Sequence, residues 1–192
     1  MRPSKPVVRL AVAALLVSAG ALAAADRYAL DPDHASVVFK VNHLGFSHTY
    51  GRFNKVEGEL VLDEAAPAKS SLRLSIDAES VDTGNARRDA HLRGPDFFDC
   101  KQFPKITFTS KAMRKTADKV WEVTGDLALH GVTKSLTLTV HQLGTGQDPW
   151  GKTRTGGDLE FTVKRSEFGM NFMPGGIGDD VTLMVSIEGI KQ

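Results

Sequence analysis

The segment Val41-Asn42-His43-Leu44-Gly45-Phe46-Ser47-His48-Thr49-Tyr50-Gly51-Arg52-Phe53 interrupts the first alternating strand pattern of the chain. That pattern ends at Val41, and a second strand pattern resumes at Phe53. Gly45 and Gly51 supply backbone freedom for turning. A simple hairpin needs only about two to five residues between its strands, and the extra residues here are apolar and aromatic. We therefore expect this segment to fold inward as an aromatic plug that closes, or opens onto, one end of a β-barrel.

Outward from this segment, apolar residues recur at every second position along most of the chain, which is typical of strands with one buried face. The expected inward positions are Val37, Phe39 and Val41; Val56, Gly58, Leu60 and Leu62; Leu72, Leu74, Ile76 and Ala78; Ile106, Phe108 and Ala112; Trp121, Val123, Leu127 and Leu129; Leu136, Leu138 and Val140; Leu159, Phe161 and Val163; and Val181, Leu183, Val185 and Ile187. One apolar and one polar face indicate antiparallel pairing. About eight such long strands predict an all-β barrel with an interior wide enough for side chains or for one ligand.

One segment departs from this period. Residues 85–93 have a helical pattern, followed by a glycine and a proline that would end a helix. A helix this short is unstable alone, so it should pack on the barrel. Asn85 would cap it, with Arg88 and Asp89 in structural ion pairs; alternatively, Asn85 and Arg88 face the barrel mouth and bind the polar head of a ligand. Spacing alone favours the structural role.

Residues 1–25 have the pattern of a signal peptide, with basic residues, an apolar stretch and the small residues Ala23-Ala24-Ala25. Residues 26–192 then form one domain, which we expect in the periplasm, or secreted if the cell lacks an outer membrane. Cleavage would change the formal net charge from +1 to about −2. Such a charge does not favour nucleic acid or an anionic membrane as the main partner, and no later segment is long and apolar enough for stable membrane insertion. An exposed strand edge could pair two copies into a homodimer.

Catalytic and metal-binding motifs are absent from the sequence. It contains no G-x-S-x-G, H-E-x-x-H or P-loop motif. Asp31, Asp33 and His34 could bind a metal, but the chemistry of an Asx turn explains them better. The single cysteine, Cys100, has no motif around it and cannot form an internal disulfide. We therefore predict no catalytic residue, no metal and no cofactor.

Several aromatic residues fall on or near the expected inward face. They are either ordinary core residues or the lining of an elongated apolar cavity, and alternation does not separate the two interpretations. The set is Phe39, Phe46, Phe53, Phe97, Phe98, Phe108, Phe161 and Phe168.

A series of short motifs in the same order resembles the YceI-like polyisoprenoid-binding proteins of bacteria. The motifs are His34 with Ser36-Val37-Val38-Phe39; His43-Leu44-Gly45-Phe46-Ser47 with Gly51-Arg52-Phe53; Asn85, Arg88-Asp89, His91-Leu92 and Phe97-Phe98; Phe103-Pro104-Lys105-Ile106-Thr107-Phe108; Gly125-Asp126-Leu127 with Leu129-His130-Gly131-Val132-Thr133-Lys134; Arg165-Ser166-Glu167-Phe168-Gly169; and Ile177-Gly178-Asp179. Ala35 stands where the family pattern has serine, a small departure.

The resemblance implies a lipocalin-like, extended antiparallel eight-stranded barrel with one short helix, whose pore holds an isoprenoid or similar long-chain lipid. The lipid tail would contact Phe39, Phe46, Phe53, Leu92, Phe97, Phe98, Phe108 and Phe168. The head group would contact His43, Asn85, Arg88, Asp89 and Arg165. The resemblance implies a non-catalytic carrier or store for a polyprenyl lipid such as an isoprenoid quinone or a polyprenyl phosphate. The alternatives are an enzyme acting on a polyprenyl head group, with His43 or His91 as acid or base, and a stress-linked structural barrel with a filled core.

Overall fold

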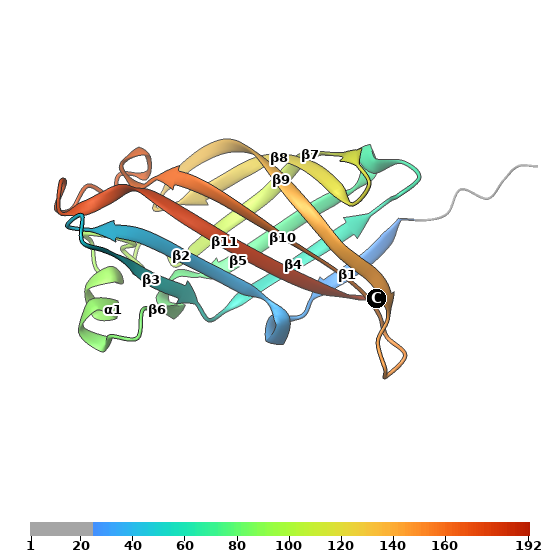
Figure 1. Ribbon diagram of the computed structural model, residues 1–192, viewed down its shortest axis with the longest axis horizontal. Helices are drawn as coiled ribbons and strands as arrows, with labels where there is room; N and C mark the ends of the chain where they lie inside the picture. The colour runs from blue at the N-terminus through green and yellow to red at the C-terminus, as the bar shows by residue number, and fades with distance from the viewer. Residues whose placement is uncertain (1–24) are drawn as a thin grey trace, which may run out of the picture.

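Antiparallel strands form an elongated barrel in the computed structural model, which describes residues 25–192 (Figure 1). Eight strands follow one another around a ring that closes where β1 pairs with β11. In ring order they are β1 (Asp26–Leu30), β4 (Val56–Leu62), β5 (Ser71–Asp77), β7 (Lys105–Ala117), β8 (Val120–Leu129), β9 (Val132–Gln147), β10 (Thr153–Lys164) and β11 (Ile177–Lys191). The expected all-β, eight-stranded antiparallel barrel is confirmed. The expected signal peptide lies outside the described residues, apart from residue 25.

Three further strands extend the wall at one end of the barrel. They are β2 (Ser36–His43), β3 (Ser47–Phe53) and β6 (Val81–Asp82), and they follow β11 in the order β2-β3-β6. Strand β1 pairs with the last residues of β11, and β2 pairs with the earlier residues of β11. The two strands therefore lie one after the other along the same edge of β11. The sequence pattern did not indicate β1. Between them, the Asp31 carboxylate accepts a hydrogen bond from the amide of Asp33 over 3.1 Å, as expected of an Asx turn.

The expected inward plug at residues 41–53 is wrong. Strands β2 and β3 pair continuously as far as His43 and Ser47, which leaves a turn of only Leu44, Gly45 and Phe46. This ladder satisfies the backbone almost to the tip, and the Phe46 side chain is 88% exposed. Gly51 lies within β3 and does not turn the chain; a Cβ atom there would collide with the ring of Phe39. The segment opens onto one end of the barrel without entering it.

Helix α1 (Ala86–Leu92) lies beside β3 and β6 at this end, and together with the two phenylalanines after it contributes to the wall of the interior. The Asn85 side chain caps the helix by accepting a hydrogen bond from the amide of Arg88 over 3.0 Å. Within residues 25–192, Arg88 and Asp89 do not form the expected structural ion pairs. Asp89 accepts hydrogen bonds from the amide and hydroxyl of Thr83, and the Arg93 guanidinium donates to two carbonyls before the helix. These bonds fix the short helix to the barrel.

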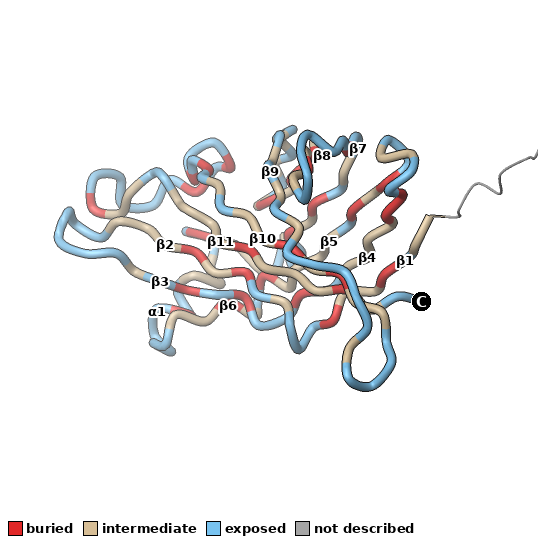
Figure 2. The backbone as a smooth tube through the Cα atoms, turned by 45° about the vertical axis from the view of Figure 1, so that its right-hand side comes forward, coloured by how far each residue is buried: buried red, intermediate tan, exposed pale blue. Residues whose placement is uncertain are grey.

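The predicted inward face is largely confirmed: most of its residues line the cavity or belong to the core, and buried positions recur along the barrel strands (Figure 2). Ala112 is the exception, because it is exposed while Met113 is buried. A bulge in β7 between Ser110 and Ala112 shifts the register against β8 and exchanges the two faces. Within residues 25–192, none of the helices is long and apolar enough to cross a membrane.

Candidate functional site

An apolar cavity of about 160 Å³ occupies the middle of the barrel. Its walls come from β2, β3, β5, β7, β8, β9, β10 and β11, together with α1 and the residues after it. Thr107 and Arg165 are the only lining residues with polar side chains, and no polar atom of the wall is exposed to the cavity. A chamber of this kind favours an apolar occupant and offers no hydrogen bond to a polar one.

A second chamber of about 60 Å³ continues the cavity toward the far end of the barrel. The two chambers share Leu72, Val123, Val140 and Ile187 in their walls. At the far end, the indole of Trp121 donates a hydrogen bond to Gln142 over 3.1 Å. Gln142 in turn donates a hydrogen bond to Thr145 over 3.0 Å, so its side chain is occupied by other residues of the protein.

A wider cavity of about 670 Å³ forms the mouth at the α1 end. It shares lining residues with the central cavity, among them Phe39, Leu92 and Phe97, so the three spaces follow one another along the barrel axis. His43, His48 and Arg88 line the mouth and are absent from the walls of the two inner chambers. The arrangement suits a long molecule with a polar end at the mouth and an apolar body within.

Aromatic rings surround the passage from the mouth to the central cavity. His91, Phe97 and Phe172 pack against one another with ring centroids 4.9–5.3 Å apart. Phe53 packs between Phe39 and Phe98 at 5.8 and 5.4 Å. Such packing holds the rings as a rigid apolar collar.

Six of the eight residues predicted to contact a lipid tail line the central cavity. They are Phe39, Phe53, Leu92, Phe97, Phe98 and Phe108. Phe46 does not line it, because it lies on the exposed β2–β3 turn. Phe168 does not line it either: its side chain is only 1% exposed and packs into the core behind the wall, while its carbonyl accepts a hydrogen bond from the His130 ring.

The five residues predicted to contact a head group lie at the same end of the barrel, but most of their polar atoms have partners. The Arg88 guanidinium lines the mouth and donates to the hydroxyl and carbonyl oxygens of Thr83 over 2.7 and 2.8 Å. Asn85 is occupied as the helix cap, and Asp89 is buried on Thr83. His43 is exposed in the mouth wall. A role of these residues in head-group binding stays a prediction.

Arg165 has a clear structural task. Its side chain is buried and donates to the carbonyl oxygens of Met170, Ile177 and Gly178 over 2.6, 3.0 and 2.9 Å. These bonds brace the loop from Met170 to Gly178, which forms one lip of the mouth. Removing a buried guanidinium would leave three carbonyls without their donor.

The barrel wall is incomplete between β9 and β10. Their ladder starts at the hairpin and stops at His141 and Asp158. Beyond it, residues 132–140 pair only with β8, and residues 159–164 only with β11, within the described sheet. Side chains from both edges line the central cavity, including Leu136, Leu138 and Phe161. A seam filled by side chains alone therefore runs beside the cavity.

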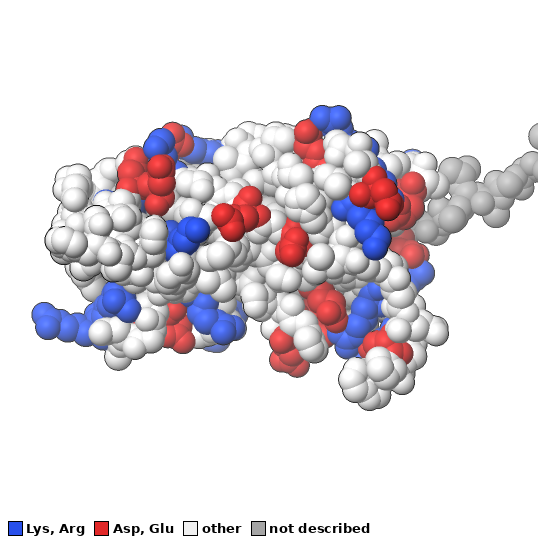
Figure 3. Space-filling view, viewed as in Figure 1, with Lys and Arg blue, Asp and Glu red and all other residues white. Residues whose placement is uncertain are grey.

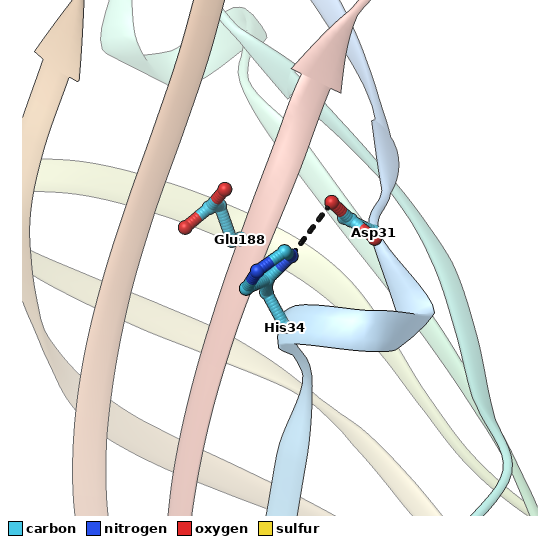
Figure 4. Close-up of side chains that lie close together, drawn as sticks. All are labelled: Asp31, His34 and Glu188. Atoms are coloured by element: carbon cyan, nitrogen blue, oxygen red, sulfur yellow. Dashed lines mark hydrogen bonds and ion pairs between the residues drawn. The ribbon is translucent and has the colours of Figure 1, made fainter. Parts of the chain in front are cut away.

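Asp31, His34 and Glu188 gather on the outside of the barrel, with potential ligand atoms within 4.8 Å of one another (Figure 4). An arginine already supplies the positive charge: Arg154 contacts Asp31 at 2.6 Å, Glu188 at 2.5 Å and Asp148 at 2.6 Å. Hydrogen bonds from Arg154, and then from His34, lower the pKa of Asp31 to about 2. This group fastens the β1–β2 turn to β10 and β11, and a metal ion would have to displace the guanidinium.

Sequence reasoning placed Trp121 on the inward face, but it missed the lip residues Phe172 and Met173 and the far-end residue Gln142. The signal for the lip was available, since residues 168–178 contain no charged residue. The hydrogen bond between Trp121 and Gln142 had no sequence signal, because it depends on how β8 and β9 are placed beside each other. Cys100 is half-buried, and burial raises the pKa of its thiol, which disfavours the reactive thiolate.

The fold and site define a class: a lipocalin-like antiparallel barrel that encloses an elongated apolar cavity. Within that class, residues 28–189 match the YceI-like domain, and the chain belongs to this family. It is 40% identical over 190 residues to Protein YceI of Escherichia coli O157:H7, covering 98% of each chain. It is also 40% identical over 190 residues to a UPF0312 protein of Pseudomonas paraeruginosa, again with 98% of each chain covered.

Solved structures have the same fold. The crystal structure of Burkholderia cenocepacia BcnA matches with a TM-score of 0.73 and 25% identity, covering 83% of this chain and 98% of the other. The YceI protein of Campylobacter jejuni matches with a TM-score of 0.67 and 30% identity, covering 79% and 90%. A polyisoprenoid binding domain from Saccharophagus degradans matches with a TM-score of 0.66 and 19% identity, covering 86% and 98%, a likeness of fold alone.

Proposed function

We propose that this protein is a non-catalytic carrier or store that holds the tail of a polyisoprenoid, or of a similar long-chain amphiphile, inside its barrel. The observation that carries the proposal is the succession of apolar chambers from the mouth to the far end. Each buried CH₂ group of a tail would gain roughly 0.8 kcal/mol from leaving water. A filled structural core would not leave such a space.

The comparisons support the same ligand class. The chain belongs to the YceI-like family, and one protein of like fold is described as a polyisoprenoid binding domain. The tail would be recognised by its length and apolar character, because the wall of the central chamber offers it no free polar atom. An isoprenoid quinone and a polyprenyl phosphate would differ only at the mouth, beside His43 and Arg88.

The periplasm is the compartment we propose, on the strength of the signal-peptide pattern in residues 1–25. A carrier in this compartment would shield an apolar chain from water between two membranes. Where the cell has a single membrane, the same leader would send the protein outside.

Native mass spectrometry of protein purified from its own periplasm, followed by organic extraction, tests this function. We expect one long-chain isoprenoid per protein, displaced by added polyprenol. An empty protein that also ignores added polyprenols and quinones would refute the proposal. Turnover of a polyprenyl diphosphate, lost in His91→Ala, would instead support an enzyme that uses the contact of 2.8 Å between His91 and Asp96 at the mouth.

A further inference from the structure

The two lips of the mouth carry no charged side chain. Residues 41–51 and 168–178 contain no Asp, Glu, Lys or Arg, although these types make up 24% of the whole chain. At that average, about five charged residues would be expected in segments of this combined length. In Figure 3 the left end of the molecule, where the β2–β3 turn lies, is mainly white above the blue side chains at its lower edge. The two segments without charged residues lie at the opening of the cavity.

Large apolar side chains project from both lips into solvent. Phe46 is 88% exposed, Leu44 45% and Tyr50 56%, and on the opposite lip Phe172 and Met173 are 38% and 43% exposed. A monomer in water rarely exposes neighbouring apolar groups of this size without a partner for them. Their position at the tips means that a flat surface could contact both lips at once.

The backbone ties the two lips together. The amide of Leu44 donates to the carbonyl oxygen of Gly176 over 2.8 Å, which joins the turn to the loop. Arg165 braces the same loop from inside through three carbonyls. The exposed side chains therefore stand on a fixed frame, so they could insert into a partner with little loss of conformational freedom.

Cationic side chains stand beside the uncharged lips. Arg87 and Arg88 are exposed on α1, next to the mouth, and blue side chains lie below the white end in Figure 3. Arg87 forms no ion pair within residues 25–192. Two acidic residues next to the lip are paired, Glu167 with Lys134 and Asp180 with Lys164. An apolar tip beside an exposed arginine is the pattern of a surface that rests in the interface of an anionic bilayer.

We propose that the mouth docks on the surface of a lipid bilayer, with Phe46 and the residues of the opposite lip in the interfacial layer and Arg87 over anionic head groups. This inference rests on the proposed carrier function, because a tail passing between a bilayer and the barrel would then never cross open water. A chain drawn from the membrane enters past the aromatic collar, and its head stays at the bilayer surface beside the mouth.

The β9–β10 hairpin at the opposite end provides a matched control. Its tip carries Trp150, which is 81% exposed, but Asp148 and Lys152 lie within two residues of it. Phe46 and Trp150 are therefore similarly exposed aromatic residues at opposite ends of the barrel, and only Trp150 has charged residues close to it in the sequence.

Vesicle flotation tests the inference with residues 26–192 of the wild type, Phe46→Ser and Trp150→Ser. Vesicles contain phosphatidylcholine with or without added phosphatidylglycerol. We expect the wild type to float with anionic vesicles and Phe46→Ser to partition about tenfold less, in line with losing one buried aromatic ring. Trp150→Ser should float like the wild type, and circular dichroism would check that both variants fold.

The same preparations separate this inference from the carrier function. Wild-type protein that binds a polyprenol in detergent but never floats would overturn the docking inference alone. Wild-type protein that floats through Phe46 but binds no polyprenol would overturn the carrier function and leave docking intact. Equal partitioning of Phe46→Ser and the wild type, or a loss in Trp150→Ser as large as in Phe46→Ser, would also overturn the docking inference.

Discussion

Val140 stands at the boundary between the central and far chambers and offers a way to shorten the cavity. It lines both chambers and lies opposite Trp121 in the register between β8 and β9. Val140→Phe would place a ring across the connection. The space it enters is already open, so the substitution should cost less stability than overpacking a filled core.

The size of the effect follows from the volumes. The far chamber has about 60 Å³ beside about 160 Å³ in the central one, so about a quarter of the inner space would be cut off. An isoprene unit adds about five carbons, and each CH₂ contributes roughly 0.8 kcal/mol. Losing one unit from the barrel should therefore cost about 4 kcal/mol, close to a thousandfold in affinity.

Displacement of a fluorescent fatty acid by polyprenols of increasing length would measure this. In the wild type, affinity should rise with chain length up to a plateau. In Val140→Phe the plateau should begin at least one isoprene unit earlier, with unchanged affinity for shorter chains. His141→Phe, on the exposed face of the same strand, is the control. Identical length profiles for Val140→Phe and the wild type would refute a tail that reaches the far chamber.

Two further predictions concern stability and the seam. Asp31→Asn preserves the turn acceptor for Asp33, but it removes a carboxylate whose side chain is 9% exposed and whose pKa is lowered from 3.8 to about 2. A carboxyl group whose pKa is lowered by folding stabilises the fold at pH values above its pKa in the unfolded chain, and this contribution is lost as the pH falls through about 2. In urea denaturation, the free energy of unfolding of Asp31→Asn should therefore be about 2 kcal/mol below that of the wild type at pH 7 and nearly equal to it at pH 2. An equal loss at both pH values would contradict this assignment. Amide hydrogen exchange should be faster in residues 132–140 than in β8, which is paired on both sides. A lipid bound in the cavity should slow the exchange of residues 132–140. Equal protection of the two segments before lipid is added would mean that the seam is closed in solution.

Alternation predicted the barrel because it reports directly which face of a strand is buried. The inward sets of β8 and β11 are found as expected, since both strands keep one register along these positions. The same rule failed at Ala112, where one additional residue in β7 reversed the faces. A bulge leaves no trace in an apolar pattern when both candidate residues, here Ala112 and Met113, are apolar.

The turn at residues 44–46 was misjudged for a different reason. Aromatic and apolar residues usually indicate burial, and on that basis Phe46 was predicted to point inward. Hydrogen bonding between β2 and β3 extends to His43 and Ser47, so the backbone has no slack with which to fold the tip into the barrel. The composition was informative, but it indicated an exposed apolar surface and not a core.

The predicted polar site shows what sequence spacing leaves undetermined. Asn85, Arg88, Asp89 and Arg165 were selected because they could reach a head group, and they do gather at the mouth end. In the structure, most of their polar atoms form hydrogen bonds with Thr83, the start of the helix and the 170–178 loop. An arginine next to a cavity can brace the wall or bind the ligand, and only the geometry of its hydrogen-bond donors separates the two roles.

Taken together, the contacts divide recognition between two regions of the barrel. The interior can select only for length and apolar character, because no polar atom of the central wall is exposed to the cavity. Any preference for a head group must arise at the mouth, where the uncharged lips and the exposed His43 meet α1. A carrier built in this way would accept one class of tail with several heads, and a bilayer against the mouth would contribute as much to head-group selection as the protein itself.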